Sequence, residues 1–205
     1  MSTWAIVPVK PIYQGKSRLA AVLSQHERVL LNQMLYVHLL QVLQDVEEIE
    51  EILVVSRDSS ILSTARQYRA RTLQEDGRIN LNLALRRATA MAQIYAASEV
   101  LILPVDLPLA SSDDVGAILK AARFERGIVI VPDRHLRGTN ALLVRPPGVL
   151  EYQFGNNSFE AHCRQAHQKG LEVRTLELPS IAFDLDWPED LEYWRQHQLN
   201  PLTLS

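Results

Sequence analysis

The sequence has 205 residues, of which 47% are hydrophobic and 22% are charged, the ordinary balance of a globular chain with a packed core. Its formal net charge of −3 argues against a nucleic-acid partner held by bulk electrostatics, so an anionic ligand must be met by a local group of Lys and Arg. The length favours one domain over two, and we expect that domain to span residues 1–205.

The start of the chain and its cysteine content bear on the compartment. Cys163 is the one cysteine, which leaves no intramolecular disulfide and suits a reducing environment. The first residues carry no basic region followed by an apolar run, and no apolar stretch approaches the roughly 18 residues of a membrane span. We therefore expect a cytoplasmic protein with no membrane partner, and leave open whether it forms a homodimer.

Short β-rich runs alternate with longer helical segments along the chain. The strands are expected at residues 4–9, 52–56, 71–73, 99–104, 127–132, 140–144 and 171–178. The helices are expected to run from Ser24 to about 45, over 60–68 and 80–97, from Ser111 onward, and over 158–169 and 188–197.

Local signals support several of these boundaries. Ser24 with Glu27, and Ser111 with Asp114, have the spacing of a capping box at a helix start. Gly170 is suited to the position after a helix. Because strands and helices alternate and the strands are near-continuous runs of Val, Ile and Leu, the sequence predicts a three-layer α/β/α domain with a mostly parallel, doubly wound sheet.

Ligands of such sheets bind beyond the carboxyl ends of the strands. This rule indicates the segments at 10–18, 74–82, 105–108 and 138–140, which the segments at 155–158 and 184–186 could join.

Three cations directly follow the first strand. Lys10, Lys16 and Arg18 lie within nine positions, and such a cluster could cradle a triphosphate and stabilise charge that develops during its transfer. The spacing is not that of a P-loop, since the glycine pair and the Gly-Lys-Ser/Thr order are missing. The alternative is a solvated basic loop.

Acidic residues end two other segments. Asp106 closes a buried apolar strand, where a carboxylate is costly unless it is ligated or hydrogen-bonded. Magnesium is a natural partner because it takes one or two carboxylates together with phosphate oxygens. The alternative is that Asp106 caps the turn before Pro108.

Asp184 and Asp186 occupy alternate positions, so in an extended chain their side chains point the same way. Either could bind a metal, and Asp186 could equally be the N-cap of the helix that begins at Pro188. Glu189 and Asp190 are expected only to interact with the dipole of that helix.

A glycine and a serine precede the helix at 158–169. Gly155 would let a phosphate approach the backbone, and Ser158 would add a hydroxyl to the free amides of a helix start. The alternative is that Ser158 is a simple N-cap. His162 lies one turn later and is expected to pack there or to approach the same site. Cys163 has no evident base, so a thiol nucleophile is not expected.

Together these segments resemble the guanylyltransferase family of coenzyme F-420 biosynthesis, which acts on 2-phospho-L-lactate or phosphoenolpyruvate. The resemblance covers about residues 4–194. It rests on the runs Val7-Pro8-Val9-Lys10-Pro11, Lys16-Ser17-Arg18-Leu19, Leu103-Pro104-Val105-Asp106-Leu107-Pro108-Leu109, Gly138-Thr139-Asn140-Ala141-Leu142, Phe154-Gly155 with Ser158-Phe159 and His162, and Asp184-Leu185-Asp186 with Pro188.

The resemblance implies a nucleotide-diphospho-sugar-transferase-like fold, GTP as donor and Mg²⁺ as cofactor. By position, the phosphorylated acid would be bound by Thr139, Gly155 and Ser158, and metal by Asp106 with one of Asp184 and Asp186. Lys10, Lys16 and Arg18 would hold the triphosphate. The nucleotide would lie near Val9, Ser56, Glu75 and Asn82. The sequence departs from the family at 133–138, which has one glycine where the family often has more, and at the bulky pair Tyr13-Gln14.

The expected reaction is attack by a phosphate oxygen of the acid on the α-phosphorus of GTP, with release of pyrophosphate. One alternative is a nucleotidyltransferase for another acceptor, such as 3-phosphoglycerate, a sugar phosphate or a pterin. Another is a non-catalytic nucleotide-binding module on the same fold.

Overall fold

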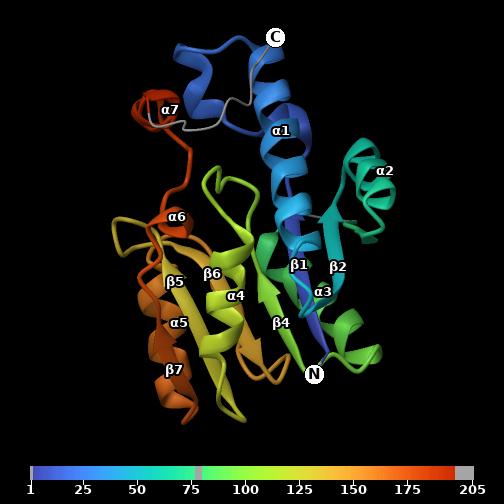
Figure 1. Cartoon of the computed structure of the whole chain (residues 1–205), viewed down its shortest axis with the longest axis vertical. Coiled ribbons are helices and arrows are strands. Elements are labelled where there is room, and N and C mark those ends of the chain that lie inside the picture. The colour runs from blue at the N-terminus through green and yellow to red at the C-terminus, as the bar shows by residue number, and fades with distance from the viewer. Residues whose placement is uncertain (1, 77–79, 197–205) are drawn as a thin grey trace.

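A seven-stranded sheet with the strand order β3-β2-β1-β4-β6-β5-β7 forms the middle layer of the computed structural model (Figure 1). The structure describes residues 2–76 and 80–196. The strands are β1 (Thr3–Val9), β2 (Ile49–Ser56), β3 (Arg71–Gln74), β4 (Glu99–Ile102), β5 (Gly127–Pro132), β6 (Thr139–Arg145) and β7 (Glu172–Thr175).

The sheet is parallel except for β6. This strand runs antiparallel to both of its neighbours, β4 and β5. Because its direction is reversed, the first residue of β6, Thr139, lies at the edge where β5 ends, and it pairs there with Pro132. A mostly parallel sheet is confirmed, and the reversed strand brings its amino end to the ligand-binding edge.

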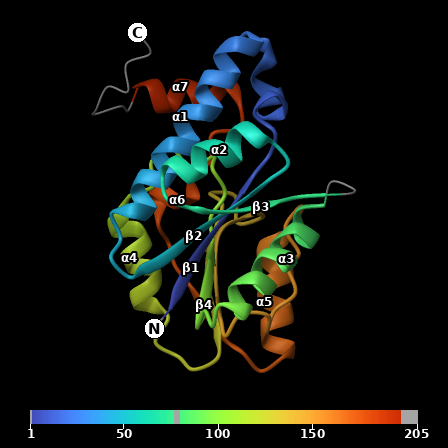
Figure 2. The ribbon, with the colours of Figure 1, turned by 90° about the vertical axis from the view of Figure 1, so that its right-hand side faces the viewer.

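Helices cover both faces of the sheet, as expected. They are α1 (Gln25–Gln44), α2 (Ser59–Gln67), α3 (Leu81–Ile94), α4 (Ser112–Ala121), α5 (Ser158–Gln168), α6 (Pro179–Ala182) and α7 (Pro188–Gln196), with short 3-10 turns η1 (Ile12–Gln14) and η2 (Ser17–Ala21). Figure 2 shows the sheet between α4 on one side and α3 and α5 on the other. Among these helices none is long and apolar enough to cross a bilayer.

The two-residue period of β1 divides its side chains between two cores. Ala5, Val7 and Val9 pack in the core beneath α1, α2 and α4. Trp4 and Ile6 point to the opposite face and pack in the core beneath α3 and α5. Both faces of the central strand are therefore buried, which explains its near-continuous apolar sequence.

A third apolar cluster lies beyond the carboxyl edge of the sheet. It joins η2, the first half of α1, the chain at 183–185 and α7, through Leu19, Leu23, Leu31, Leu35, Phe183, Leu185, Leu191 and Trp194. In Figure 1 the first turns of α1, the η turns and α7 stand above the sheet. This cluster anchors the acidic segment at 184–186 over the strand ends.

The helix starts follow the sequence closely. Both capping boxes are present, with Ser24 and Glu27 at α1 and with Ser111 and Asp114 at α4. The expected helix over 80–97 ends earlier: α3 stops at Ile94, and Ala96 adopts a positive φ of 59°. The expected strand over 171–178 is also shorter, because β7 ends at Thr175 and the helix α6, which the sequence analysis missed, begins at Pro179. The end of the last predicted helix, residue 197, lies outside the described residues.

Candidate active site

The basic loop after β1 directs the side chain of one lysine toward the interior of the protein. Lys16 has a left-handed backbone with φ of 55°, between the turns η1 and η2. Asn32 of α1 stabilises the loop by donating from Nδ2 to the carbonyl of Ile12 at 2.9 Å. The side chain of Lys16 is only 5% exposed, so this cation is not part of a solvated basic loop. Lys10 is exposed just beyond the end of β1.

The acidic segment at 184–186 lies directly against the loop after β4. The amide of Leu185 donates to the carbonyl of Asp106 at 2.9 Å. Phe183 and Leu185 are buried in the apolar cluster above the sheet. Since side chains of an extended chain alternate, Asp184 and Asp186 lie on the side opposite to these two apolar residues.

Lys16 joins the two acidic segments. Its Nζ lies 3.1 Å from Oδ1 of Asp186 and 3.7 Å from Oδ2 of Asp106. Arg18 approaches the other oxygen of Asp186 at 2.9 Å, and its guanidinium lies 4.6 Å from the centre of the Trp187 ring. These contacts favour a charged site that Asp106 and Asp186 share. They argue against the alternatives in which Asp186 is only a helix N-cap and Asp106 only caps a turn.

The surroundings of the third carboxylate, Asp184, disfavour its negative charge. Burial raises the pKa of Asp184, and the neighbouring charges of Asp106 and Asp186 raise it further. The three acids are thus close enough to repel one another, and Lys16 supplies part of the compensating charge. Within residues 2–76 and 80–196 no set of three or more His, Cys, Asp or Glu side chains has the arrangement of a metal site by itself.

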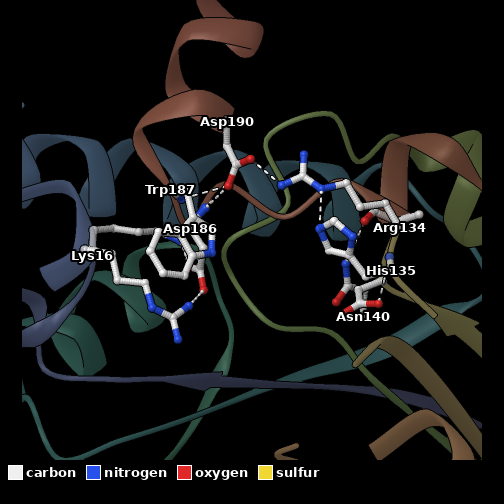
Figure 3. Close-up of polar contacts among 10 residues, drawn as sticks. Lys16, Arg134, His135, Asn140, Asp186, Trp187 and Asp190 are labelled. Atoms are coloured by element: carbon white, nitrogen blue, oxygen red, sulfur yellow. Dashed lines mark hydrogen bonds and ion pairs between the residues drawn. The ribbon is translucent and has the colours of Figure 1, made fainter. Parts of the chain in front are cut away.

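Asp190 has a larger role than the helix-dipole contact that the sequence suggested. Its side chain is buried, and one oxygen accepts from the amides of Asp186 at 2.9 Å and Trp187 at 2.7 Å. Its other oxygen pairs with Arg134 (Figure 3). Burial opposes the charge of Asp190, but the bonds from Arg134 and the two amides outweigh it and lower the pKa. The expectation of a simple dipole partner is wrong, because Asp190 holds the acidic segment in place.

The same region is tied to the loop between β5 and β6. Asn140 donates from Nδ2 to the carbonyls of Ile181 and Ala182 at 2.9 and 3.2 Å. The amide of Arg134 donates to Ala182 as well. The start of β6 and the loop before it are therefore bonded to α6, directly before the acidic segment.

The residues expected to bind a phosphorylated acid also come together. The hydroxyl of Ser158 donates to Oγ1 of Thr139 at 3.1 Å, and both side chains are buried. Ser158 is not an N-cap: the cap position of α5 is Asn157, which makes no side-chain capping bond. The prediction that the backbone amides at this helix start are free is wrong in part. The amides of Ser158 and Phe159 already donate to the carbonyls of Gly155 and Arg137.

A hollow of about 430 Å³ opens at the residues that precede this hydroxyl pair in the chain. It is lined by Asp133, Arg137, Gly138, Gly155, Asn156 and Asn157. Gly155 has φ of 137°, and no other group comes within 4 Å of the position that a Cβ would take there. Gly155 therefore leaves the backbone accessible to a ligand in this hollow, and Asp133 shapes the opposite wall by accepting from the amides of His135, Arg137 and Gly138.

The residues expected near the nucleotide lie in two groups. Val9 and Ser56 are paired at the ends of β1 and β2, and the carbonyl of Ser56 accepts from the amide of Glu75. Asn82 lies on α3 and bonds with both the amide and the carbonyl of Phe154, beside Gly155. Residues 77–79 of the predicted 74–82 segment lie outside the described residues. The contact of these four residues with a nucleotide stays a prediction.

This mostly parallel sheet, with charged side chains gathered beyond its carboxyl ends, has a fold that is also found in solved structures. A putative nucleotide-diphospho-sugar transferase from Desulfovibrio desulfuricans has the same fold, with a TM-score of 0.78 at 17% identity, covering 100% of this chain and 92% of that one. The chain therefore has the fold of nucleotide-diphospho-sugar transferases.

Sequence comparison gives the family. Residues 3–197 match the family described as "Guanylyl transferase CofC like", and the chain belongs to it. A phosphoenolpyruvate guanylyltransferase of Sphaerobacter thermophilus is 40% identical over 197 residues, 96% of this chain and 94% of the relative. A 2-phospho-L-lactate guanylyltransferase of Methanothermobacter thermautotrophicus is 33% identical over 199 residues, 93% of this chain and 83% of the relative. The resemblance drawn from the sequence motifs is confirmed.

Proposed function

We propose that this protein transfers GMP from GTP to the phosphate of phosphoenolpyruvate, with release of pyrophosphate, as a step toward coenzyme F-420. The observation that carries the proposal is the meeting of Asp106, Asp186 and Lys16 at one point, since both acids lie within 4 Å of the same ammonium. Phosphoenolpyruvate is preferred to 2-phospho-L-lactate because the relative named for it is the more similar of the two, at 40% against 33% identity.

The donor set fits Mg²⁺. This ion takes one or two carboxylates and completes its shell with water and substrate phosphate oxygens, so it does not need the larger side-chain cluster that the described residues lack. Asp106 with Asp184 or Asp186 would hold it, and its charge would offset the burial and the repulsion between the acids that together raise the pKa of Asp184. When bound, the ion would polarise the phosphate at which transfer occurs.

The side chains of the protein would bring two anions together and keep them aligned. Two unit charges 4 Å apart repel by about 4 kcal/mol at an effective dielectric constant near 20. Lys16 is held by two carboxylates and is almost fully buried, so its charge is positioned before substrate arrives and needs little reorganisation. Arg18 is half-exposed beside it and would contact the triphosphate from the open side.

No protein nucleophile is needed for the transfer. A phosphate oxygen of the acid is already anionic, and its lone pair would form the new bond to the α-phosphorus of GTP. The bond from the α-phosphorus to the bridging oxygen would break, and its electron pair would leave with pyrophosphate. The acid would lie in the hollow at Gly155, whose lining includes the residues directly before Thr139 and Ser158, and where backbone groups and the hydroxyl of Thr139 would meet a small acceptor.

An acceptor panel tests this function. The protein is incubated with Mg²⁺ and either GTP or CTP, together with phosphoenolpyruvate, 2-phospho-L-lactate, 3-phosphoglycerate or a sugar phosphate, and pyrophosphate release is measured. We expect the highest kcat/KM with GTP and phosphoenolpyruvate. Faster turnover of another acceptor would replace the proposed one, and nucleotide binding without turnover of any acceptor would contradict the proposal in favour of a non-catalytic module.

A further inference from the structure

A buried histidine lies behind the hydroxyl pair at the acceptor hollow. The side chain of His162 is fully buried on α5. Its Nε2 accepts from the amide of Gln153 at 2.9 Å, and its Nδ1 lies 3.1 Å from Oγ1 of Thr139. The Phe154 ring also packs against the imidazole in an edge-to-face arrangement, with ring centres 5.0 Å apart. His162 is therefore held on two sides by the loop before α5, and its Nδ1 faces Thr139.

The partner at Nε2 decides which nitrogen carries the proton. A backbone amide can only donate, so Nε2 must offer its lone pair to Gln153. In a neutral imidazole the proton then sits on Nδ1, which donates to Thr139. The neutral form is favoured, because burial lowers the pKa of His162 to about 4.

This arrangement fixes the direction of the Thr139 hydroxyl. Its oxygen accepts from Nδ1 of His162 and from the hydroxyl of Ser158, which uses both of its lone pairs. The hydroxyl proton of Thr139 must then point to an acceptor outside this set. A phosphate or carboxylate oxygen can only accept, so a hydroxyl fixed as a donor is the form that binds such a group.

We propose that His162 is a positioning residue for the phosphorylated acid, which fixes the hydroxyl of Thr139 as a donor to that substrate. This inference rests on the proposed function, since it needs the acid to bind beside Thr139. Gly138 and Asn157, the residues that precede Thr139 and Ser158, line the hollow, so the hollow reaches the chain directly before each of the two hydroxyl residues. His162 itself acts only through Thr139.

Two substitutions separate this role from a purely structural one. The side-chain amide of H162N reaches about as far as Nδ1 and can still donate to Thr139, but it gives up the bond to Gln153. The carbonyl of H162Q reaches about as far as Nε2 and can keep the bond to Gln153, but it leaves no donor beside Thr139. A role in positioning predicts that H162N retains more function, whereas a role only in holding the loop predicts the reverse order.

Steady-state kinetics give the first readout. We expect H162Q to raise the KM for phosphoenolpyruvate by roughly ten- to a hundredfold, the effect of one hydrogen bond to a charged group, with little change in the KM for GTP. H162N should stay within about threefold of the wild type. T139V should match H162Q, and the double variant should lose little more than either alone, because both act through one bond. Additive losses, or an H162N variant worse than H162Q, would overturn the proposal.

The tautomer is measured without any substrate. In protein with ¹⁵N-labelled histidine, the signals of His162 are assigned by their loss in H162N, and we expect a protonated Nδ1 and an unprotonated Nε2. A proton on Nε2 would overturn the inference and leave the proposed function untouched. If the tautomer is as expected but the wild type transfers no nucleotide to any phosphorylated acid, the proposed function fails and the assignment of an acid to Thr139 fails with it.

Discussion

At the scale of single residues, the site depends most on a cation that the sequence could only place in a basic loop. Lys16 is buried because its left-handed backbone and the bond from Asn32 turn it inward, toward Asp106 and Asp186. Neither feature can be read from the spacing of three cations. The acids themselves were easier to predict, since a charged residue at the end of a buried strand needs a partner.

Replacing Lys16 should cost activity far more than stability. In K16M the two carboxylates lose the ammonium between them, and the charge that would be positioned against the triphosphate is lost with it. We expect kcat/KM for GTP to fall by at least a hundredfold. The matched control is K120M, which removes an exposed lysine from the last turn of α4. Similar losses in the two variants would contradict a special role of Lys16.

The burial of His162 predicts that the stability of the protein depends on pH. Its pKa is about 4 in the folded protein and about 6.5 when unfolded, so the unfolded chain binds the extra proton first. The contribution of the neutral His162 side chain to the free energy of unfolding is fully present above pH 6.5. It decreases by about 3 kcal/mol as the pH falls to 4.

The measurement is the free energy of unfolding in urea at pH 7 and pH 4.5. The wild type is compared with H162N, so that carboxylates common to both proteins cancel. The wild type should have the larger free energy of unfolding at pH 7, and this difference from H162N should become smaller, or change sign, at pH 4.5. A difference that is independent of pH would show that His162 does not lie buried and neutral.

At the scale of elements, α7 joins the site through the third apolar cluster and through the polar contacts of one side chain, Asp190. Asp190 accepts from the amides of Asp186 and Trp187 at the start of this helix and pairs with Arg134 from the neighbouring loop. Its position in the first turn also fits an ordinary dipole contact, which is why the sequence analysis missed this role. A carboxylate that follows Asp-x-Asp by four residues could have been recognised as a partner for the amides of that segment.

D190A should therefore destabilise the protein and disturb the site together. We expect a loss of about 2–3 kcal/mol in the free energy of unfolding, because the change removes charged hydrogen bonds and leaves Arg134 without its acid. The control is E189A, an exposed neighbour in the same turn. Equal denaturant midpoints for the two variants would contradict the account of Asp190.

Element types were predictable where one local signal dominated. Runs of Val, Ile and Leu marked the central strands, whereas β3 and β7 are short and mixed in composition. Two capping boxes marked the starts of α1 and α4. The direction of β6 was not predictable, because hydrophobic pattern carries no information on strand direction. The short helix α6 was missed because Pro179 directly follows a segment of largely alternating apolar and polar residues, 171–178, which is typical of a strand.

At the scale of the whole molecule, the site is assembled from places far apart in the sequence. Five segments meet at one edge of the sheet. They are the loop after β1, the loop after β4, the start of β6, the first turn of α5 and the segment before α7. The rule that ligands bind beyond the strand ends predicted most of these places, and the third apolar cluster explains how the 184–186 segment reaches them. The amino end of β6 joins them only because that strand is reversed.

The central claim is that Asp106 and the Asp184–Asp186 pair hold one divalent ion under the bound nucleotide. The measurement is Mg²⁺-dependent pyrophosphate release by D106N, with D113N, an exposed acid on α4, as the control, and with binding of Mn²⁺ followed by electron paramagnetic resonance. D106N should keep its fold, lose at least a hundredfold in kcat, and bind Mn²⁺ with nucleotide more weakly, whereas D113N should match the wild type. Turnover and Mn²⁺ affinity of D106N within a few-fold of the wild type would contradict the account.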